Sequence, residues 1–386
     1  MLLVDGCATR SFRGATGGAE HFITVEAPAG DGLAEQLDQV ERRYAEALDS
    51  IGLAPDTAVF RRIYLSDAPN QIGLVRESTL FRDPVAGPVA VAVVQQPPLT
   101  RAKIALLAYH IETPRPLTKW ALSPNHMLVE KNGLGHLWST QLCADTIAPP
   151  VSAGEQTRVV FNDLIKALAD QGGTLAEHCV RTWLYVRDVD VFYQDLVDSR
   201  TALYARQGLT ADTHYIASTG IEGACPHRYD TVLMDAYSVL GLDPAQVSYL
   251  NDFSRLCPTK EYEVTFERGT RIAYADRAHH FISGTASIDR FGRVVHVGQV
   301  LRQLDRALEN VDALLRSGGA LLDDMTHMLV YLRDPADFAR VDAYIAERFP
   351  RLPVLLLRGA VCRPEWLIEV EGVAVVANDA PDLPAF

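Results

Sequence analysis

Two stretches of the chain that lie far apart carry hydrophobic residues with helical spacing. In each stretch these residues recur at steps of three and four, which places them on one face of an amphipathic helix. They are Leu33, Leu37, Val40, Tyr44 and Leu48 in the first stretch, and Leu301, Leu304, Leu308, Val311 and Leu315 in the second. Each stretch therefore predicts a helix that packs one face against a core.

One sequence pattern occurs three times: a glycine, then a run that leads from a helix into a strand, then an aspartate. The distance from the glycine to the aspartate is the same in all three copies. The pattern runs from Gly52 to Asp67, from Gly173 to Asp188 and from Gly319 to Asp334. The strand segments read FRRIYLSD, VRTWLYVRD and HMLVYLRD, and each has a tyrosine three residues before the aspartate. Upstream, each copy opens with a histidine and a β-prone run, namely HFITV, HLWST and HFISG. This agreement predicts three copies of one structural unit.

Each copy continues into a second helix and closes with two apolar β runs. Asp334 and Pro335 begin the second helix of the third copy, where aspartate caps free amides and proline fits the first turn, so Asp334 is interpreted as a helix cap. The two closing runs are separated by a proline-containing turn, which predicts a hairpin. The expected fold is α/β of the α+β type, with three βαβαββ units whose sheets are each backed by two helices and meet around a pseudo-threefold axis. Clefts are expected between the units.

The repeats also set the expected domain limits. An N-terminal region, residues 1–240, holds two degenerate units at about 20–112 and 135–240, and residues 241–386 form the C-terminal unit. Stretches rich in proline, glycine or polar residues near 113–133 and 241–260 are expected to connect the copies.

Composition narrows the class of partner. The chain has 386 residues, 48% hydrophobic content and a formal net charge of −13, which argues against a nucleic acid or an anionic membrane as the main partner. An anionic substrate would need a local basic pocket. No run approaches the ~18 apolar residues of a membrane span and the start lacks a secretion signal, so a cytoplasmic location is expected.

Metal and cofactor signals are weak. The six cysteines are scattered without a CxxC pair, so neither a zinc site nor a disulfide framework is predicted, and the thiols are expected to be reduced. His279 and His280 are adjacent and lack the HxxxH or HxxEH spacing of a metal site. No glycine-rich phosphate loop suggests a nucleotide cofactor. The expectation is therefore an enzyme without a cofactor or a metal.

The third unit resembles the RidA/YjgF family of enamine and imine deaminases over about residues 270–376. The resemblance rests on SGTASID, on VLRQLDRALENVDALL and on the final WLIEVEGVAVV. Those deaminases form trimers with a site at each subunit interface, and an arginine two residues after a proline holds the substrate carboxylate. Here Pro353 is followed by Val354 and Leu355, which argues against deamination.

The whole chain resembles the chorismatases, which fuse an N-terminal region to a deaminase-like C-terminal domain and mimic the trimer in one polypeptide. The motifs are THYIASTGIEG at 213–223 and GAVCRPEWLIEVEG at 359–372, supported by RTWLYVRD. The resemblance implies an enzyme that splits chorismate into pyruvate and an aromatic or dihydroaromatic acid. It also implies a monomer, because the fused units already satisfy the interfaces of a trimer.

Glu369 is the candidate acid. Cleavage of the enolpyruvyl ether requires a proton on the terminal methylene carbon, so the acid must be neutral at working pH. A glutamate buried in an apolar cleft meets this need, because desolvation and a second carboxylate both raise its pKa. The resemblance places the family's essential glutamate in this strand, and the period of two puts Glu371 on the same face. The alternative is an amphipathic strand whose glutamates face water.

The first unit's equivalent strand, AKIALLAYHI, has no glutamate, which predicts one working cleft.

Cys362 lies seven residues before Glu369, where hairpin pairing would bring it close. The resemblance associates a cysteine here with release of 3-hydroxybenzoate, whereas an alanine accompanies hydrolysis to a dihydroxycyclohexadiene carboxylate. The alternative is a buried cysteine that acts only as a small hydrophobe. The 3-hydroxybenzoate branch tends to have glycine at the position of Ala275, so this chain departs there and mixed products, including 4-hydroxybenzoate, stay open.

The two carboxylates of chorismate require cationic partners, and arginine binds carboxylates with a planar fork. The candidates are Arg358, Arg363, Arg181 and Arg228, although many arginines of a chain this size lie on its surface. Hydroxyl and backbone partners for the ring are expected from the THYIASTG strand, whose alternative is ordinary strand composition. They are Tyr215, Ser218, Thr219 and Gly220.

Three functions remain open. The leading hypothesis is a chorismatase that gives pyruvate and 3-hydroxybenzoate, or the dihydrodiol by hydrolysis. The second is hydrolysis of reactive enamines or imines. The third is a small-molecule binder without catalysis, because fold alone does not fix function.

Overall fold

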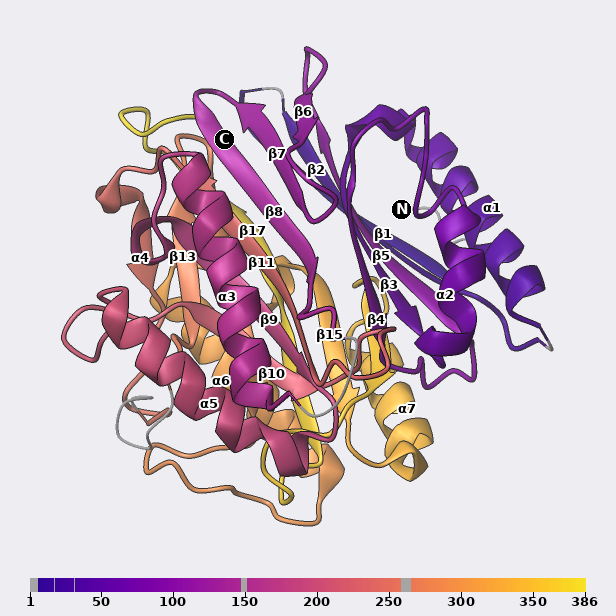
Figure 1. Cartoon of the computed structure of the whole chain (residues 1–386), viewed down its shortest axis with the longest axis vertical. Coiled ribbons are helices and arrows are strands. Elements are labelled where there is room, and N and C mark those ends of the chain that lie inside the picture. Colours follow the sequence, from indigo (N-terminus) through magenta and orange to yellow (C-terminus); the bar gives the residue numbers. More distant parts are fainter. Residues whose placement is uncertain (1–5, 17, 31, 147–150, 258–264) are drawn as a thin grey trace.

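A computed structural model describes residues 6–16, 18–30, 32–146, 151–257 and 265–386. It contains three mixed sheets with helices on their outer faces (Figure 1). None of the helices within these ranges is long and apolar enough to cross a membrane.

The first sheet has the strand order β1-β2-β5-β3-β4 and is covered by α1 and α2. Its elements are β1 (Cys7–Arg13), β2 (Ala19–Glu26), α1 (Leu33–Ile51), β3 (Ala58–Leu65), α2 (Ala68–Glu77), β4 (Ala90–Gln95) and β5 (Ile104–Glu112). The predicted helix is confirmed, since all five of its periodic residues are buried against this sheet.

The second sheet has the order β10-β9-β11-β8-β7-β6 and is covered by α3 and α5 (Figure 1). Its strands are β6 (Thr118–Ala121), β7 (His126–Lys131), β8 (Leu134–Leu142), β9 (Cys179–Val186), β10 (Ala217–Glu222) and β11 (Val232–Leu240). Its helices are α3 (Ala153–Asp170), α4 (Leu175–His178) and α5 (Val189–Arg206).

The third sheet has the order β12-β13-β14-β17-β15-β16 and is covered by α6 and α7. Its elements are β12 (Val247–Tyr249), β13 (Gly269–Ala273), β14 (Arg277–Ala286), α6 (Val300–Ser317), β15 (Met325–Leu332), α7 (Phe338–Arg348), β16 (Val354–Arg358) and β17 (Ile368–Ala377). The second predicted helix is α6. Asp334 is a cap, but of the short 3-10 turn Pro335–Asp337 that leads into α7: its carboxylate accepts a hydrogen bond from the Ala336 amide at 2.9 Å.

The prediction of a closing hairpin in each unit is wrong. The two closing strands lie on opposite sides of the central strand: β16 pairs parallel to β15, whereas β17 pairs antiparallel to it. The other two sheets repeat this arrangement, with β4 and β5 around β3 and with β10 and β11 around β9. The chain follows a helical crossover into the parallel strand and then returns on the far side of the central strand, between it and the opening strands.

The expected connectors are partly structured. The stretch 113–133 contains β6 and β7, which extend the second sheet beyond β8. The stretch 241–260 contains β12, which pairs with β13 at the edge of the third sheet. The second and third units thus gain edge strands that the repeat pattern did not reveal.

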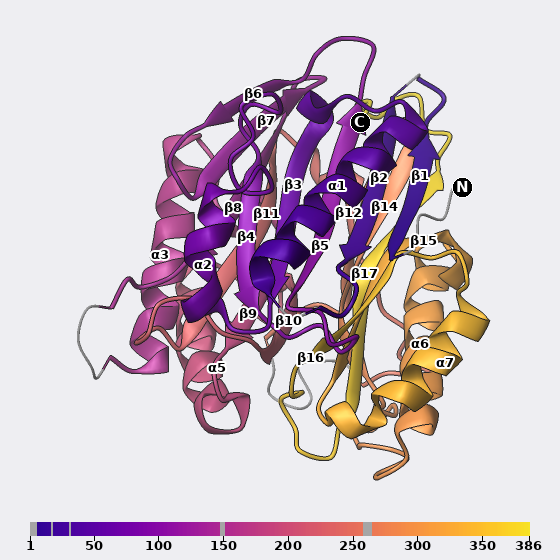
Figure 2. The same ribbon diagram turned by 90° about the vertical axis from the view of Figure 1, so that its right-hand side faces the viewer.

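The inner faces of the three sheets share one continuous apolar core. Aromatic rings link them across the centre: Phe60 of the first sheet stacks on Trp138 of the second at 4.7 Å between centroids. Trp138 lies 4.4 Å from Tyr237, whose ring is 5.5 Å from Phe281 of the third sheet. Figure 2 shows the helices outside and the sheets inside. The three units therefore pack around a common centre, as the repeat predicted.

One buried arginine–carboxylate pair crosses each junction between sheets. Arg62 pairs with Asp235 between the first and second sheets at 3.0 Å, and Arg277 pairs with Glu20 between the third and first at 2.7 Å. Arg181 pairs with Glu371 between the second and third. A buried charge is tolerated only when it is paired, so these contacts fix how neighbouring sheets align.

Candidate functional site

A cleft of about 840 Å³ opens between the second and third sheets. Its walls come from α5, from β10, from the end of β14 and from the segment 362–369. Bridges join the two sheets beside it, between Ala217 and Glu267 and between Ile221 and Val361. The volume is in the range of pockets that enclose a small organic ligand.

Glu369 projects from β17 into this cleft. Its side chain is buried, and its Oε1 atom has no hydrogen-bond partner among the described residues. Burial, and then the neighbouring carboxylate of Glu371, raise the pKa of Glu369 to about 8, against weaker opposing effects of Arg181 and Arg268. The carboxyl group is therefore mainly protonated at neutral pH.

Glycine at position 284 makes room for this carboxyl group. A Cβ atom built on Gly284 of β14 would lie 2.3 Å from Glu369 Oε1. Real side chains do not approach so closely, so any larger residue at this position would displace the acid.

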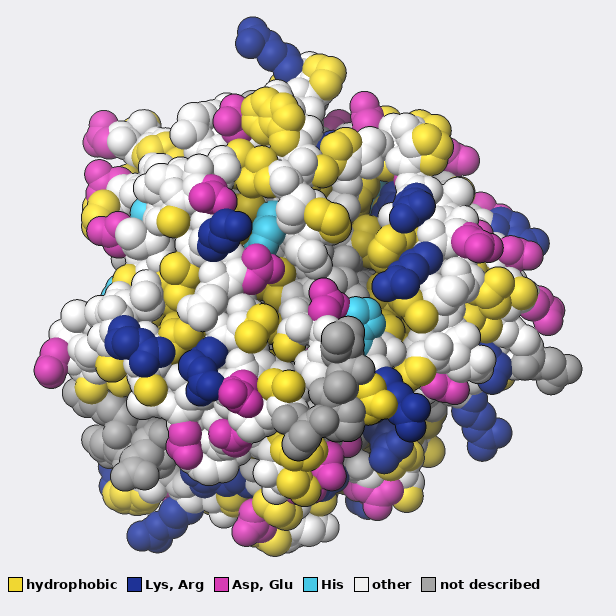
Figure 3. Space-filling model, in the orientation of Figure 1, with side chains coloured by type: hydrophobic (Ala, Val, Ile, Leu, Met, Phe, Trp, Pro, Cys, Tyr) yellow, Lys and Arg dark blue, Asp and Glu magenta, His cyan; other side chains and the backbone are white. Residues whose placement is uncertain are grey.

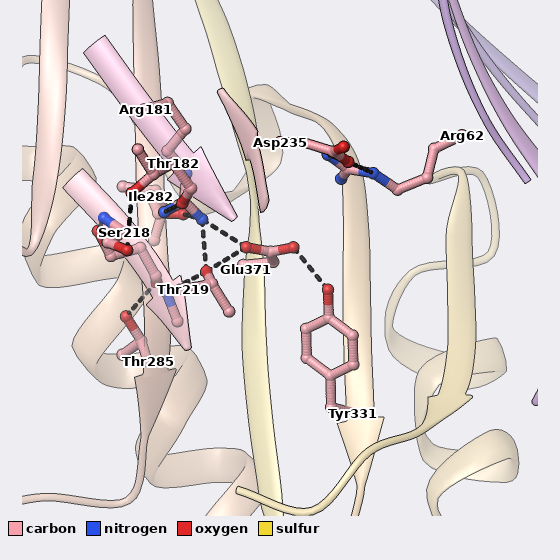
Figure 4. A network of polar contacts seen from close by, with 12 residues as sticks. Arg62, Arg181, Thr182, Ser218, Thr219, Asp235, Ile282, Thr285, Tyr331 and Glu371 are labelled. Atoms are coloured by element: carbon pink, nitrogen blue, oxygen red, sulfur yellow. Dashed lines mark hydrogen bonds and ion pairs between the residues drawn. The ribbon is translucent and has the colours of Figure 1, made fainter. Parts of the chain in front are cut away.

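Glu371 shares the strand face with Glu369, as predicted, but its carboxylate is fully engaged (Figure 4). It accepts hydrogen bonds from Arg181 and Thr219 of the second sheet and from Tyr331 Oη, the last at 2.6 Å. Glu371 therefore holds the two sheets together and presents a fixed negative charge behind Glu369.

The strand registers show that the acid occurs in one of the three units. Glu369 lies opposite Tyr331, the tyrosine of the repeated strand motif. The residues opposite the equivalent tyrosines, Tyr64 and Tyr185, are Ala105 and Leu233. The equivalent positions of the other two units therefore lack this acid, and one working cleft stays a prediction.

Cys362 lines the same cleft as Glu369. Burial and the neighbouring Glu369 raise the pKa of the Cys362 thiol to about 12, so the sulfur is a neutral thiol. Tyr193 of α5 lines the cleft together with Cys362, and its ring packs over Gly220, where a Cβ would lie 2.7 Å from it. The loop before β17 brings Cys362 close to Glu369, without the hairpin pairing that was expected.

Three arginines line the cleft. Arg200 of α5 is 1% exposed; its Nε donates to Thr265 Oγ1 at 3.1 Å, while Nη2 lacks a partner among the described residues. Arg268 is 4% exposed, and its Nη2 donates to the Cys257 carbonyl at 3.3 Å. Arg363 lies over the Trp366 ring at 4.8 Å. The cleft is thus the local basic pocket that an acidic protein needs for an anionic ligand.

On the face shown in Figure 3, acidic, basic and hydrophobic side chains are interspersed. The cleft itself is lined by three arginines, whose charge suits a small anion.

Most of the predicted site residues meet in this cleft. Those that line it are Glu369, Cys362, Arg363, Tyr215, Ser218 and Gly220. Thr219 faces away, because neighbouring strand residues alternate, and it bonds Arg181 and Glu371.

Arg181 was predicted to bind the substrate, but the structure places it outside the cleft. It is buried between the sheets, where it donates to Glu371, Thr219 and the Ile282 carbonyl, so its charge is already neutralised. It does not line the cleft.

Three further predicted residues lie elsewhere. Arg358 is exposed at the end of β16, and Arg228 is exposed over the Tyr229 ring. Ala275 lies in the turn between β13 and β14, where its amide donates to the Pro384 carbonyl at 3.0 Å. None of the three is among the lining residues of the cleft.

Four residues that line the cleft were not predicted from the sequence, namely Arg200, Arg268, Tyr193 and Gly284. For Arg200 a signal was present: it interrupts the apolar stripe of α5 formed by Leu196, Val197, Leu203 and Tyr204. A charged residue inside a buried helical stripe is unusual and needs a partner or a ligand.

Comparison with known structures agrees with this architecture. The chain has the fold of a solved chorismatase, with a TM-score of 0.63 and 17% identity, covering 95% of this chain and 99% of that one. The class of protein is thus a single-chain, three-unit assembly of RidA-like folds. Single units are also similar to smaller proteins, such as RidA from the Antarctic bacterium Psychrobacter sp. (18% identity, TM-score 0.27, 33% of this chain and 99% of that one).

The matches to the C-terminal unit show which family the chain belongs to. Residues 272–376 match the model of the family described as Endoribonuclease L-PSP. The 3-aminoacrylate deaminase RutC of Acinetobacter baylyi is 34% identical over 98 residues, which span 25% of this chain and 78% of that protein. The chain belongs to the Endoribonuclease L-PSP family through this unit.

Proposed function

We propose that the protein is a chorismatase that cleaves the enolpyruvyl ether of chorismate into pyruvate and a hydroxybenzoate-type acid. The observation that carries the proposal is a buried carboxyl group, Glu369, with a pKa raised to about 8, in a cleft lined by three arginines. The whole-length likeness to a chorismatase fold supports it.

Glu369 is the catalytic acid in this proposal. The neutral carboxyl donates its proton to the terminal methylene carbon, and the electron pair of the double bond forms the new C–H bond. The ether carbon becomes an oxocarbenium centre. If water attacks this centre, the hemiketal that forms expels the ring oxygen as an alcohol and gives pyruvate and the dihydrodiol. If the neighbouring ring hydroxyl attacks it, the carbon is bonded to both ring oxygens; its bond to the original ether oxygen then breaks, and pyruvate leaves with the hydroxyl's oxygen when the bond from that oxygen to the ring breaks. Loss of the proton on the ring carbon that keeps its oxygen then gives 3-hydroxybenzoate. A carboxyl with a pKa near working pH is suited to this transfer, because enough of it is protonated and it still releases the proton readily.

The arginines hold the two carboxylates of the substrate. Arg200 has an unsatisfied donor, and Arg268 and Arg363 lie around the same space. Their charges in the cleft also favour the carboxylate left on Glu369 after proton transfer, so they assist the step that creates it. Tyr215 and Ser218 supply polar groups beside the ring.

Cys362 is the residue proposed to decide which ring product is released. Its thiol is neutral and lies near Glu369, so it is a weak hydrogen-bond partner and a shape-defining group rather than a nucleophile. The resemblance to chorismatases associates a cysteine at this position with the branch that releases 3-hydroxybenzoate. The proposed ring product is therefore 3-hydroxybenzoate. Hydrolysis to the dihydrodiol is the alternative product.

Enamine or imine hydrolysis is the second candidate, favoured by the 34% identity to a protein named as a deaminase. Leu355 argues against it: the position at which the resemblance expects a substrate-binding arginine holds a leucine that is 0% exposed on β16.

We also propose that the chain acts as a monomer in the cytoplasm, because its three units already pack against one another.

The experiment is to incubate purified protein with chorismate and resolve the ring products by chromatography while pyruvate is followed with a coupled dehydrogenase. The proposal predicts equal amounts of pyruvate and 3-hydroxybenzoate, and a shift towards the dihydrodiol in Cys362→Ala. Cys7→Ser, a buried cysteine in β1, is the matched control and should leave the product unchanged. Absence of pyruvate from folded protein that releases ammonia from 2-aminoacrylate would favour the deaminase instead.

A further inference from the structure

A second cluster of reactive side chains lies outside the cleft, in the second unit. Cys143 follows β8, and Cys225, His227 and Asp230 lie in the loop between β10 and β11. One donor atom from each of the four residues lies within 4.8 Å of the other three. We propose that Cys143, Cys225, His227 and Asp230 form a structural zinc site.

The chemistry of the donors fits zinc. Two sulfurs, one imidazole nitrogen and one carboxylate oxygen form a four-ligand set of the kind that binds Zn²⁺ tetrahedrally. Donors about 2.0–2.3 Å from a tetrahedral ion lie roughly 3.3–3.8 Å apart, so the cluster needs to contract by about 1 Å. Four protein ligands leave no open position, which indicates a structural site rather than a catalytic one.

Asp230 supplies an independent indication. Its side chain is 0% exposed, and Oδ1 accepts a hydrogen bond from the Thr146 amide at 3.1 Å. Oδ2 has no hydrogen-bond donor within the described part of the chain and faces His227 Nδ1 at 3.2 Å. A fully buried carboxylate oxygen without a donor is costly, and a cation would compensate it.

The other contacts already orient the ligands. Cys143 Sγ lies 3.8 Å from His227 Nδ1, and the His227 amide donates to Cys225 Sγ at 3.4 Å. The carbonyls of Cys225 and His227 both accept from Arg187 Nη2 at 3.3 Å. The exposed Asp145 also lies 2.8 Å from His227 Nδ1, so this carboxylate must release the imidazole when the ion binds.

The site would stabilise the junction of all three units. Ala224, next to Cys225, pairs with Gln95 of the first sheet through two hydrogen bonds of 2.9 and 3.2 Å. The Glu222 amide, at the end of the strand that lines the cleft, donates to the Ala360 carbonyl of the segment after β16 at 3.0 Å. A zinc ion that ties this loop to Cys143 would therefore hold β10 in place.

Binding converts two thiols to thiolates, so each Zn²⁺ displaces two protons into the solvent and leaves a site with a net charge of −1. Sequence spacing did not reveal the site, because Cys143 and His227 are 84 residues apart.

The test uses tag-free, reduced, chelator-stripped protein titrated with Co²⁺ as a spectroscopic probe for zinc. The expected result is one equivalent bound per chain, with the sulfur-to-cobalt charge-transfer absorption and visible bands of tetrahedral Co²⁺. Cys225→Ser and His227→Ala should lose this signal, and Cys179→Ser, a buried cysteine of β9, should keep it. No charge-transfer band in the wild-type protein, or an unchanged band in Cys225→Ser, would overturn the proposal.

A measurement on the wild-type chain alone covers the case in which a variant fails to fold. Zn²⁺ should protect Cys143 and Cys225 from alkylation, read by mass spectrometry of peptides, and leave alkylation of Cys362 unchanged. Equal labelling with and without Zn²⁺ would contradict the zinc site.

Discussion

Replacing Glu369 by glutamine removes a carboxyl group that the fold holds protonated at neutral pH, and this change should alter how stability depends on pH. The pKa of Glu369 is raised from 4.5 to about 8 by burial and by Glu371. Between these two values the folded protein binds this proton and the unfolded chain does not. By linkage, the contribution of Glu369 to the free energy of unfolding falls as pH rises through this window and is constant above it.

The magnitude follows from the two pKa values. The difference between about 8 and 4.5 corresponds to about 5 kcal/mol at high pH, of which roughly 4 kcal/mol develops between about pH 5 and pH 9. For a chain of 386 residues, an entropy of unfolding near 2.1 cal/mol/K per residue converts this into about 5 °C in Tm. Glu369→Gln does not titrate, so its Tm relative to that of the wild type should rise by about this amount over the window.

The assay is thermal unfolding of both proteins in matched buffers from pH 5 to pH 9. Glu365→Gln is the control, because Glu365 is an exposed glutamate four residues away, and its Tm difference from the wild type should stay flat. A Tm difference between Glu369→Gln and the wild type that is constant with pH would refute the claim that Glu369 is buried as a neutral acid.

Three further predictions concern the cleft. The rate of chorismate cleavage should fall as pH rises through about 8, because Glu369 loses the proton it must donate; a rate that rises over this range would exclude Glu369 as the acid. Arg200→Gln should raise KM by roughly 10- to 100-fold, as expected for a lost charged hydrogen bond, while the exposed Arg228→Gln leaves KM unchanged in steady-state kinetics. Gly284→Ala should abolish turnover while circular dichroism stays native, because its Cβ would occupy the place of the Glu369 carboxyl; normal turnover would show that the acid can move.

The sequence was sufficient to predict the units but not the order of their strands. The repeated tyrosine and aspartate marked the central strands β3, β9 and β15, and helical periodicity located α1 and α6. An apolar run followed by a turn and a second apolar run looks the same whether the two strands pair together or flank a third. Strand pairing depends on contacts distant in sequence, which a local pattern does not contain.

The dependence on contacts distant in sequence also explains why only some of the site residues were predicted. Glu369 and Cys362 belong to one continuous motif, and both line the cleft. The arginines are contributed by different units, and alternation along β9 turned Arg181 towards Glu371 instead of the cleft. Arg200 was missed because its role depends on α5 covering a cleft that β17 reaches from the other unit.

The most direct test of the account is the initial rate of pyruvate release from chorismate at pH 7 by the wild-type protein, Glu369→Gln and Glu365→Gln at equal concentration. The wild type and Glu365→Gln should release pyruvate rapidly, and the rate of Glu369→Gln should be lower by at least about 100-fold, as expected when a general acid is removed. Release at the wild-type rate by Glu369→Gln, or none by the folded wild-type protein, would contradict the account.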